Sequence, residues 1–244
     1  KRQLGPSSST TSSWARVVPT VPLTTTLEYP VPDLPQPQGL YDPRFEHDAC
    51  GVAFVADLQG RVSHQIVADA LDALRCLQHR GATNAEPNTG DGAGVMLQVP
   101  DRFFRSVLGD DLPPAGSYAT GIGFLPPEPG LCDKAKLAIE AVVASEGLEV
   151  VAWRTVPTDP SDLGQQARSV MPSFEQLVIT SPQGLTGVDL DRQVYVARKR
   201  IEHEVPPTLG AALYFPSLSS RTFVYKGMLT TPPLSGFYPD LADP

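Results

Sequence analysis

Cysteine, basic charge and long apolar runs are all scarce in this chain of 244 residues. The three cysteines are an odd number and include no Cys-x-x-Cys pair, which favours a reducing compartment over a disulfide framework. A formal net charge of −8 argues against binding to nucleic acid through clustered Lys and Arg. No apolar run approaches the roughly 20 residues that a membrane-spanning helix needs. We therefore expect a cytoplasmic protein that binds neither nucleic acid nor a membrane.

Several familiar site motifs are missing as well. The sequence has no Gly-x-Ser-x-Gly motif of a serine hydrolase and no phosphate-binding loop that ends in Gly-Lys-Ser or Gly-Lys-Thr. Its four histidines lack ligand spacing with cysteine or with one another, which argues against a zinc site. We therefore expect neither a metal nor a cofactor in this chain.

The first part of the chain has the composition of a disordered leader. Residues 1 to about 40 are rich in Ser, Thr and Pro, which bury little surface and remove backbone donors. No acidic residue occurs before Glu28, and this composition is also typical of a transit peptide, so a plastid is the alternative location. We predict a leader or propeptide over residues 1–49 and a folded domain over residues 50–244.

The pattern changes at Cys50. The apolar run over residues 50–56 predicts a strand that is buried on both faces. After a turn, Ser63 is expected to cap a helix that ends at Gly81 and holds residues 78–80 in its last turn. The apolar face of this helix would consist of Ile66, Ala70, Ala73, Leu74 and Leu77.

The remaining chain mixes strands and helices and shows no internal repeat. Residues 89–94 form a glycine loop that leads into a strand, and Pro100-Asp101 opens a short helix. A basic cluster at Arg198-Lys199-Arg200 indicates a solvated helix face. The architecture is therefore α+β or layered α/β, with strands at 95–99, 118–125, 148–156, 174–180, 213–215 and 222–228, a turn at 126–130, and longer helices at 131–146 and 190–204.

Cys50 is the first candidate nucleophile. A thiolate attacks carbonyl carbon readily, but a free thiol is largely protonated at neutral pH and needs a base nearby. Cleavage of the peptide bond before Cys50 would create an α-amine with a pKa of roughly 8, which could be that base. The alternative for Cys50 is a buried structural thiol, and that interpretation also suits Cys76 and Cys132.

The other candidates have plain structural alternatives. Residues 89–94 could bind an anion through their amides, but they lead into a strand rather than a helix, so a tight turn is the simpler interpretation. Arg80 could simply be a cation near the carboxyl end of a helix, which is favourable by about 0.3–1 kcal/mol.

The combination of motifs is more specific than any one of them. In their order and spacing they resemble the start of the class II glutamine amidotransferase domain of the glutamate synthases, and the resemblance covers residues 41–244. The motifs are Asp-Ala-Cys-Gly-Val-Ala-Phe at 48–54, Leu-Gln-His-Arg-Gly-Ala at 77–82, Thr-Gly-Asp-Gly-Ala-Gly at 89–94 and Pro-Asp-Arg-Phe-Phe at 100–104, with agreeing segments at 194–202, 224–228 and 237–241.

This resemblance implies an N-terminal-nucleophile hydrolase, a four-layer αββα sandwich, in which cleavage makes Cys50 the first residue. Cys50 would attack the carboxamide of L-glutamine, form a thioester and release ammonia and then glutamate. Arg80 would lie beside the nucleophile and hold the N-terminal strand, and Gly90, Asp91 and Gly92 would shape the same neighbourhood.

The resemblance also implies residues that this chain does not contain. The family expects a further arginine that clamps the glutamine carboxylate and an Asn-Gly pair that supplies the oxyanion hole, whereas Asn84 and Asn88 are the only asparagines here and neither precedes glycine. An oxyanion donor is typically worth about 10² to 10³ in rate. We therefore expect a C-terminally incomplete domain that is inactive alone.

The parent enzyme would bring further components. The resemblance implies FMN, an iron-sulfur cluster and a synthase domain that adds the ammonia to 2-oxoglutarate, all outside this chain. The expected partners are those remaining domains together with a small reductase subunit or ferredoxin.

Two other hypotheses stay open. One is an amidotransferase of the same class that makes amidophosphoribose or asparagine, although the segments at 225–228 and 237–241 favour glutamate synthase. The other is an inactive fragment or a non-catalytic binding or regulatory module in which Cys50 remains internal.

Overall fold

The computed structural model describes residues 51–81, 86, 88–109, 111–209 and 211–243. The chain divides into units 1–48 and 49–244, and all described residues belong to the second. The predicted leader and Cys50 itself lie outside the described residues. None of the described helices is long and apolar enough to cross a membrane.

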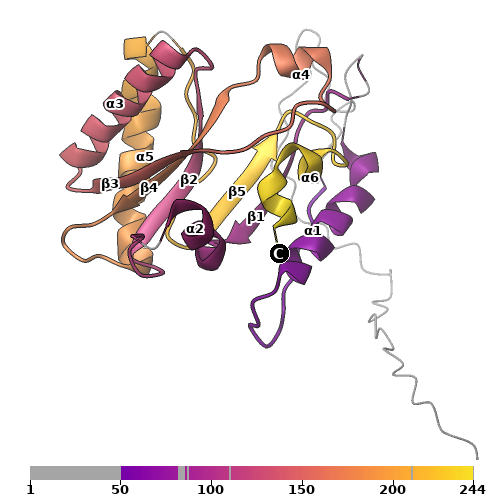
Figure 1. The fold of residues 1–244 in the computed structure, drawn as a ribbon, viewed down its shortest axis with the longest axis horizontal. Coiled ribbons are helices and arrows are strands. Elements are labelled where there is room, and N and C mark those ends of the chain that lie inside the picture. Colours follow the sequence, from indigo (N-terminus) through magenta and orange to yellow (C-terminus); the bar gives the residue numbers. More distant parts are fainter. Residues whose placement is uncertain (1–50, 82–85, 87, 110, 210, 244) are drawn as a thin grey trace, which may run out of the picture. The chain divides into compact units, whose positions relative to one another are not determined.

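The described residues form an α+β fold, as predicted (Figure 1). Every strand pair is antiparallel, in a two-stranded sheet of order β1-β5 and a three-stranded sheet of order β2-β4-β3. The strands are β1 Ala93–Gln98, β2 Tyr118–Leu125, β3 Glu149–Thr155, β4 Ser173–Thr180 and β5 Thr222–Gly227. The helices are α1 His64–Cys76, α2 Asp101–Leu108, α3 Pro129–Ser145, α4 Gln165–Ser169, α5 Gly187–Leu209 and α6 Leu234–Phe237, with short 3₁₀ helices η2 Gln78–Arg80 and η3 Pro239–Ala242.

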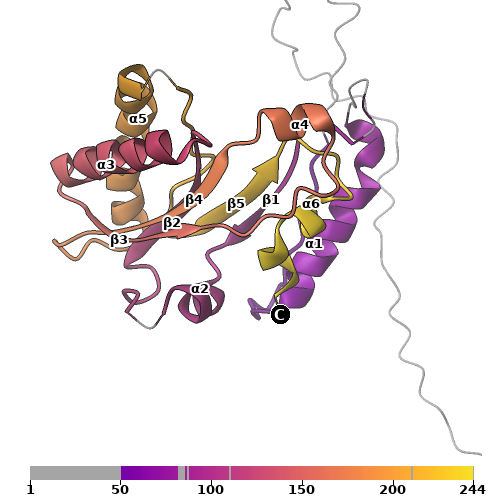
Figure 2. The ribbon, with the colours of Figure 1, turned by 45° about the horizontal axis from the view of Figure 1, so that its top comes forward.

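Two hydrophobic cores lie on opposite faces of the three-stranded sheet, because neighbouring residues of a strand point to opposite faces. One core joins Ala119 and Leu177 to helices α3 and α5, and the other joins Tyr118 and Val178 to α2 and α6. Figure 2 shows α3 and α5 on one side of this sheet and α2 on the other. The predicted apolar stripes of α3 and α5 are confirmed, since all their members are buried: Cys132, Ala135, Ile139, Val142, Leu190, Val194, Ala197 and Ile201.

Small residues on one face of β2 let the chain approach it closely. A Cβ atom at Gly121 would overlap the Ser217 carbonyl oxygen and would lie 3.2 Å from the Leu218 Cα atom. The bridges Thr120–Ser219 and Phe124–Tyr214 hold this passing segment against β2. The segment then continues into β5, so this contact connects the two sheets.

We expect Gly121→Ala to lower the free energy of unfolding by about 3 kcal/mol, because the new methyl group would overlap the backbone of Ser217 and Leu218, which cannot rotate away as a side chain could. Gly130→Ala is the matched control, since a Cβ atom there meets no atom within 4 Å. Urea denaturation of both variants measures the difference. Equal stabilities would contradict the close packing described for β2.

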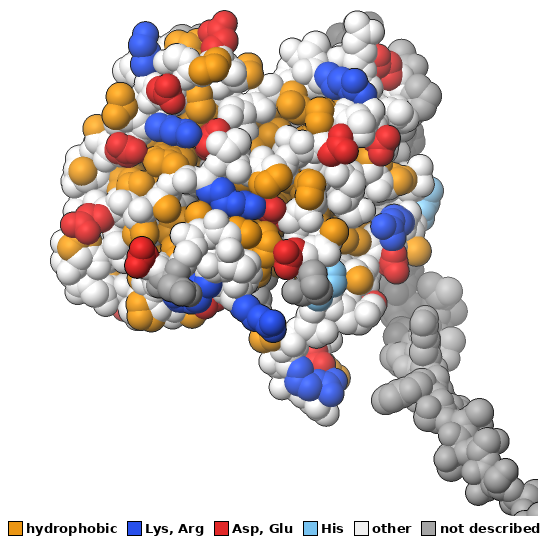
Figure 3. Space-filling view, viewed as in Figure 1, with side chains coloured by type: hydrophobic (Ala, Val, Ile, Leu, Met, Phe, Trp, Pro, Cys, Tyr) orange, Lys and Arg blue, Asp and Glu red, His pale blue; other side chains and the backbone are white. Residues whose placement is uncertain are grey.

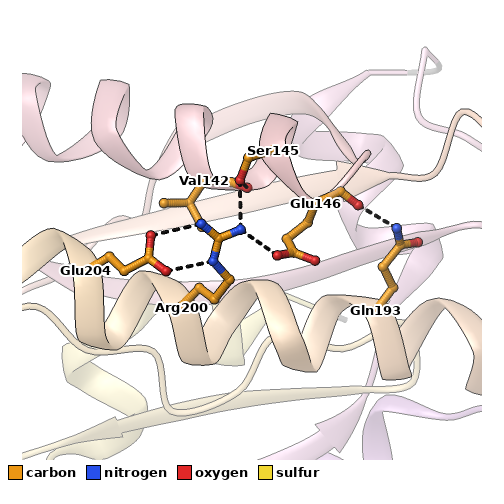
Figure 4. A network of polar contacts seen from close by, with 6 residues as sticks. All are labelled: Val142, Ser145, Glu146, Gln193, Arg200 and Glu204. Atoms are coloured by element: carbon orange, nitrogen blue, oxygen red, sulfur yellow. Dashed lines mark hydrogen bonds and ion pairs between the residues drawn. The ribbon is translucent and has the colours of Figure 1, made fainter.

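A polar network joins α3 to α5 (Figure 4). The Arg200 guanidinium donates to Glu204 at 2.7 and 3.0 Å and to the Glu146 Oε1 atom at 2.5 Å. Gln193, about two turns earlier along α5, donates to the Glu146 carbonyl oxygen. The solvated basic face predicted at residues 198–200 is present in part, since these side chains are 19%, 41% and 36% exposed, but all three also form ion pairs within or between helices.

The strand predicted over residues 50–56 is also wrong in its described part. Residues 51–56 belong to no strand, and the side chains of Val52 and Phe54 are 84% and 92% exposed. An apolar run forms a strand only when a second strand supplies hydrogen-bond partners. Among the described strands, none pairs with this run.

The first helix differs from its prediction in detail. Ser63 caps α1 by accepting a hydrogen bond from the Gln65 amide at 3.1 Å, as predicted. The α-helix ends at Cys76, however, and residues 78–80 form η2. The buried position of α1 is Leu71, so Cys76 lies about 140° around the helix from it. Cys76 is therefore exposed rather than buried, whereas Cys132 is buried, which raises its pKa.

The other differences concern short elements. The expected strand at 213–215 contributes only the bridge at Tyr214, and the predicted turn at 126–130 ends early because Pro129 opens α3. Helix α5 extends beyond the predicted 190–204 at both ends. The short helices α4 and α6 had no prediction, because one or two turns are too short to show periodicity.

Candidate functional site

The residue after the candidate nucleophile lies against η2. A Cβ atom at Gly51 would lie 3.0 Å from the Cβ atom of Arg80 and 3.3 Å from that of Leu77. This approach is closer than most side chains allow, so glycine suits position 51. The start of the predicted catalytic segment therefore lies next to Arg80. Cys50 itself is not among the described residues.

The glycine loop meets the same turn from the other side. The Asp91 Oδ1 atom lies 3.4 Å from the position of a Cβ atom on Gly81, the residue after Arg80. Both Asp91 and Arg80 are exposed. Contacts thus run from Gly51 through Arg80 and Gly81 to Asp91, which unites three motifs that are far apart in the sequence.

The loop glycines are required by close backbone contacts. Gly90 is buried, and a Cβ atom there would lie 2.8 Å from the Leu229 carbonyl oxygen. Gly92 has a φ of +133°, a conformation that other residues rarely adopt, and it faces the Gly227 carbonyl oxygen. The backbone of residues 227–229, at and just after the end of β5, therefore supports the glycine loop. Of these residues, Leu229 lies outside the family motif at 224–228.

Sequence reasoning missed Glu86, which lies just before this loop. Its Oε2 atom accepts hydrogen bonds from the Thr89 hydroxyl at 2.7 Å and from the Gln166 amide at 3.0 Å. These two donors hold the pKa of the Glu86 carboxyl below its ordinary value. Nothing in the sequence pointed to this residue, because its partner in α4 is remote along the chain.

An apolar pocket of about 270 Å³ lies beside the end of β5. Gly227, Met228 and Leu229 form one wall, so the pocket shares this segment with the glycine loop. The other lining side chains include Phe124, Phe174, Tyr214 and Phe237, and none carries a charge. These side chains offer no cation to a substrate carboxylate.

Charge is distributed without a single-sign patch on the face shown in Figure 3, where acidic and basic side chains alternate over an apolar background. Within the part of the chain that the structure describes, no three His, Cys, Asp or Glu side chains are grouped so that they could hold a metal ion.

Comparisons with known proteins identify the relatives of this chain. The large chain of glutamate synthase [NADPH] from Bacillus subtilis is 41% identical over 212 residues, which cover 86% of this chain and 14% of the relative. Ferredoxin-dependent glutamate synthase 1, chloroplastic/mitochondrial, from Arabidopsis thaliana is 41% identical over 211 residues, or 85% of this chain and 13% of the relative. Glutamate synthase [NADH] from Schizosaccharomyces pombe is 40% identical over 217 residues, again 85% of this chain and 10% of the relative. This chain thus spans only about a tenth to a seventh of these relatives.

The family model of the class II glutamine amidotransferases matches residues 50–244, so the match begins at the residue that chemical reasoning selected as the nucleophile. With four-fifths of the sequence covered by that model, this chain belongs to the class II glutamine amidotransferases.

Proposed function

We propose that residues 50–244 supply the glutamine-hydrolysing part of a glutamate synthase. The observation that carries this proposal is the contact of Gly51 with Arg80, because it joins the segment that begins at Cys50 to a second motif of the family. The names of the relatives support glutamate synthase over the amidotransferases that make amidophosphoribose or asparagine.

The proposed reaction begins after the peptide bond between residues 49 and 50 is cleaved. The free α-amine of Cys50 takes the proton of the thiol, and the sulfur attacks the carboxamide carbon of L-glutamine. The amine returns the proton to the leaving nitrogen, so ammonia departs and a thioester remains. Water then attacks the thioester and gives a proton to the amine, after which the thiol and glutamate are released.

The neighbouring residues have positioning roles in this proposal. Arg80 packs its aliphatic stem against Gly51 and so fixes the direction of the N-terminal segment. Gly90, Asp91 and Gly92 form the adjoining wall. We further propose that the complete domain is the four-layer αββα sandwich of N-terminal-nucleophile hydrolases, in which a second layer covers the exposed side chains of Val52, Phe54 and Met96.

The remaining chemistry belongs to other parts of the proposed enzyme. There, ammonia adds to 2-oxoglutarate and reduction yields glutamate, with FMN and an iron-sulfur cluster as redox groups. The relatives are named for NADPH, NADH or ferredoxin. The proposed electron donor is a small reductase subunit or ferredoxin. Its proposed location is the cytoplasm, or a plastid as in the chloroplastic relatives.

The deciding experiment is intact-mass analysis and N-terminal sequencing of the protein purified from its native host, followed by an assay of ammonia release from glutamine. We expect a mature chain that begins at Cys50 and releases ammonia. A stable protein in which residue 49 is still joined to Cys50 would lack the proposed base. That result would favour an inactive fragment or a binding module instead.

A further inference from the structure

A carboxylate and a backbone carbonyl oxygen connect the glycine loop and the residues just before it to the start of α4. One oxygen of Glu86 accepts the Thr89 hydroxyl proton at 2.7 Å and the Gln166 amide proton at 3.0 Å. The Gly164 amide also donates to the Asn88 carbonyl oxygen at 3.3 Å. Thus two hydrogen bonds, to Glu86 and to Asn88, connect this segment to the start of α4, and the hydroxyl and the amide of Thr89 each donate to Glu86 within the segment.

The atoms around this carboxylate are closely packed. Thr89 is fully buried, and a Cβ atom at Gly164 would overlap both the Thr89 Oγ1 atom and the Glu86 Oε2 atom. On its other side, Gly90 rests on the backbone of Leu229. The loop is therefore held from two directions just before Asp91.

We infer that Glu86 is a positioning residue for glutamine hydrolysis, which fixes residues 88–92 so that Asp91 lies over Gly81 beside Arg80. This inference rests on the proposed function. Glu86 acts through Thr89 and α4, and it lies at the end of the loop remote from Asp91. A misplacement of about 1 Å in an active site can cost 10²-fold in rate, so an anchor at this distance is enough to affect catalysis.

The test compares Glu86→Ala and Glu86→Gln in the protein from its native host. We expect Glu86→Ala to lower kcat/KM for glutamine hydrolysis by about 10- to 100-fold and to speed hydrogen exchange at residues 88–92. Glu86→Gln keeps an acceptor oxygen for both donors and should retain most of the rate. Glu128→Ala is the matched control, because Glu128 precedes α3 without making a side-chain cap.

The pH dependence of exchange at residues 88–92 separates a local anchor of this loop from a residue that only stabilises the fold as a whole. Because the Thr89 hydroxyl and the Gln166 amide lower the pKa of Glu86, its charged form supports the loop above the ordinary value of 4.5 and loses that support as the pH falls through the lowered pKa. Protection of residues 88–92 in the wild-type protein should therefore decline in acid. Glu86→Gln should show no such decline, since its amide does not titrate.

The outcomes separate the anchor from the proposed function. If the wild-type protein hydrolyses glutamine and Glu86→Ala shows the same hydrogen exchange at residues 88–92 and the same kcat/KM, the inference is overturned. The proposed function would not be affected. Faster global unfolding with unchanged kinetic constants per folded molecule would overturn it too, because Glu86 would then be structural only. A wild-type protein without glutaminase activity would refute both the function and any catalytic effect of Glu86.

Discussion

Replacing Cys50 by alanine is expected to lower the rate of glutamine hydrolysis by at least about 10³-fold, because the attacking sulfur is lost and no other group can form the thioester. The change removes the attacking sulfur, so no acyl-enzyme can form in the variant. The measurement is ammonia release at saturating glutamine, together with mass detection of the acyl-enzyme after rapid acid quenching. The wild-type protein should show an added mass that the variant lacks.

Cys76→Ala provides the matched control for this experiment. Cys76 is an exposed thiol at the end of α1, so general thiol reactivity would act through it as readily as through Cys50. We expect full activity in Cys76→Ala. If Cys50→Ala kept a tenth of the wild-type rate, or if the acyl group were found on Cys76, the assignment of Cys50 would be wrong.

Replacing Asp240 by asparagine is expected to lower the free energy of unfolding by about 3–5 kcal/mol, because it leaves a buried guanidinium without its counter-charge. Asp240 accepts two hydrogen bonds from Arg154, at 2.7 and 2.9 Å, and a third from the Tyr225 hydroxyl at 2.9 Å. The side chains of Arg154 and Asp240 are only 12% and 5% exposed. These contacts tie β3, β5 and η3 together, so their loss should loosen both sheets.

Asp189→Asn is the control for this prediction. Asp189 pairs with Arg192 on the surface of α5, where both side chains are more than two-thirds exposed. An exposed pair of this kind contributes about 0–1 kcal/mol. Urea denaturation of both variants should therefore separate them clearly, and similar losses of stability would mean that the Arg154–Asp240 pair is solvated in solution.

The regular elements were largely predictable because burial leaves a periodic record in the sequence. Strand β2 occupies the predicted residues 118–125, and the buried stripes of α3 and α5 contain every predicted member. The strand predicted over residues 51–56 is absent, because an apolar pattern does not reveal whether a partner strand exists. The prediction that Cys76 is buried was wrong, because a residue at the edge of an apolar stripe is exposed when the helix is rotated slightly about its axis.

The site was predictable as a set of motifs, but its assembly was not. Three family motifs selected Cys50, Arg80 and the loop 90–92, whose catalytic roles stay predictions. The contacts that unite them, such as Gly51 with Arg80 and Gly90 with Leu229, join residues that are distant in the sequence. Glu86 was missed for the same reason, since a carboxylate that accepts from a backbone amide leaves no pattern in the side chains of either segment.

The pairing of β1 with β5 has a consequence for how the site is assembled. β1 is made before the three-stranded sheet and α5, whereas β5 is made after them, so their register forms only when that entire stretch of chain has been closed into a loop. The entropy of closing a loop grows slowly with its length, but contacts that are distant in sequence form slowly. The glycine loop at one end of β1 and its supporting backbone at the end of β5 therefore meet late in folding. This topology slows the formation of the site but costs the folded protein little stability.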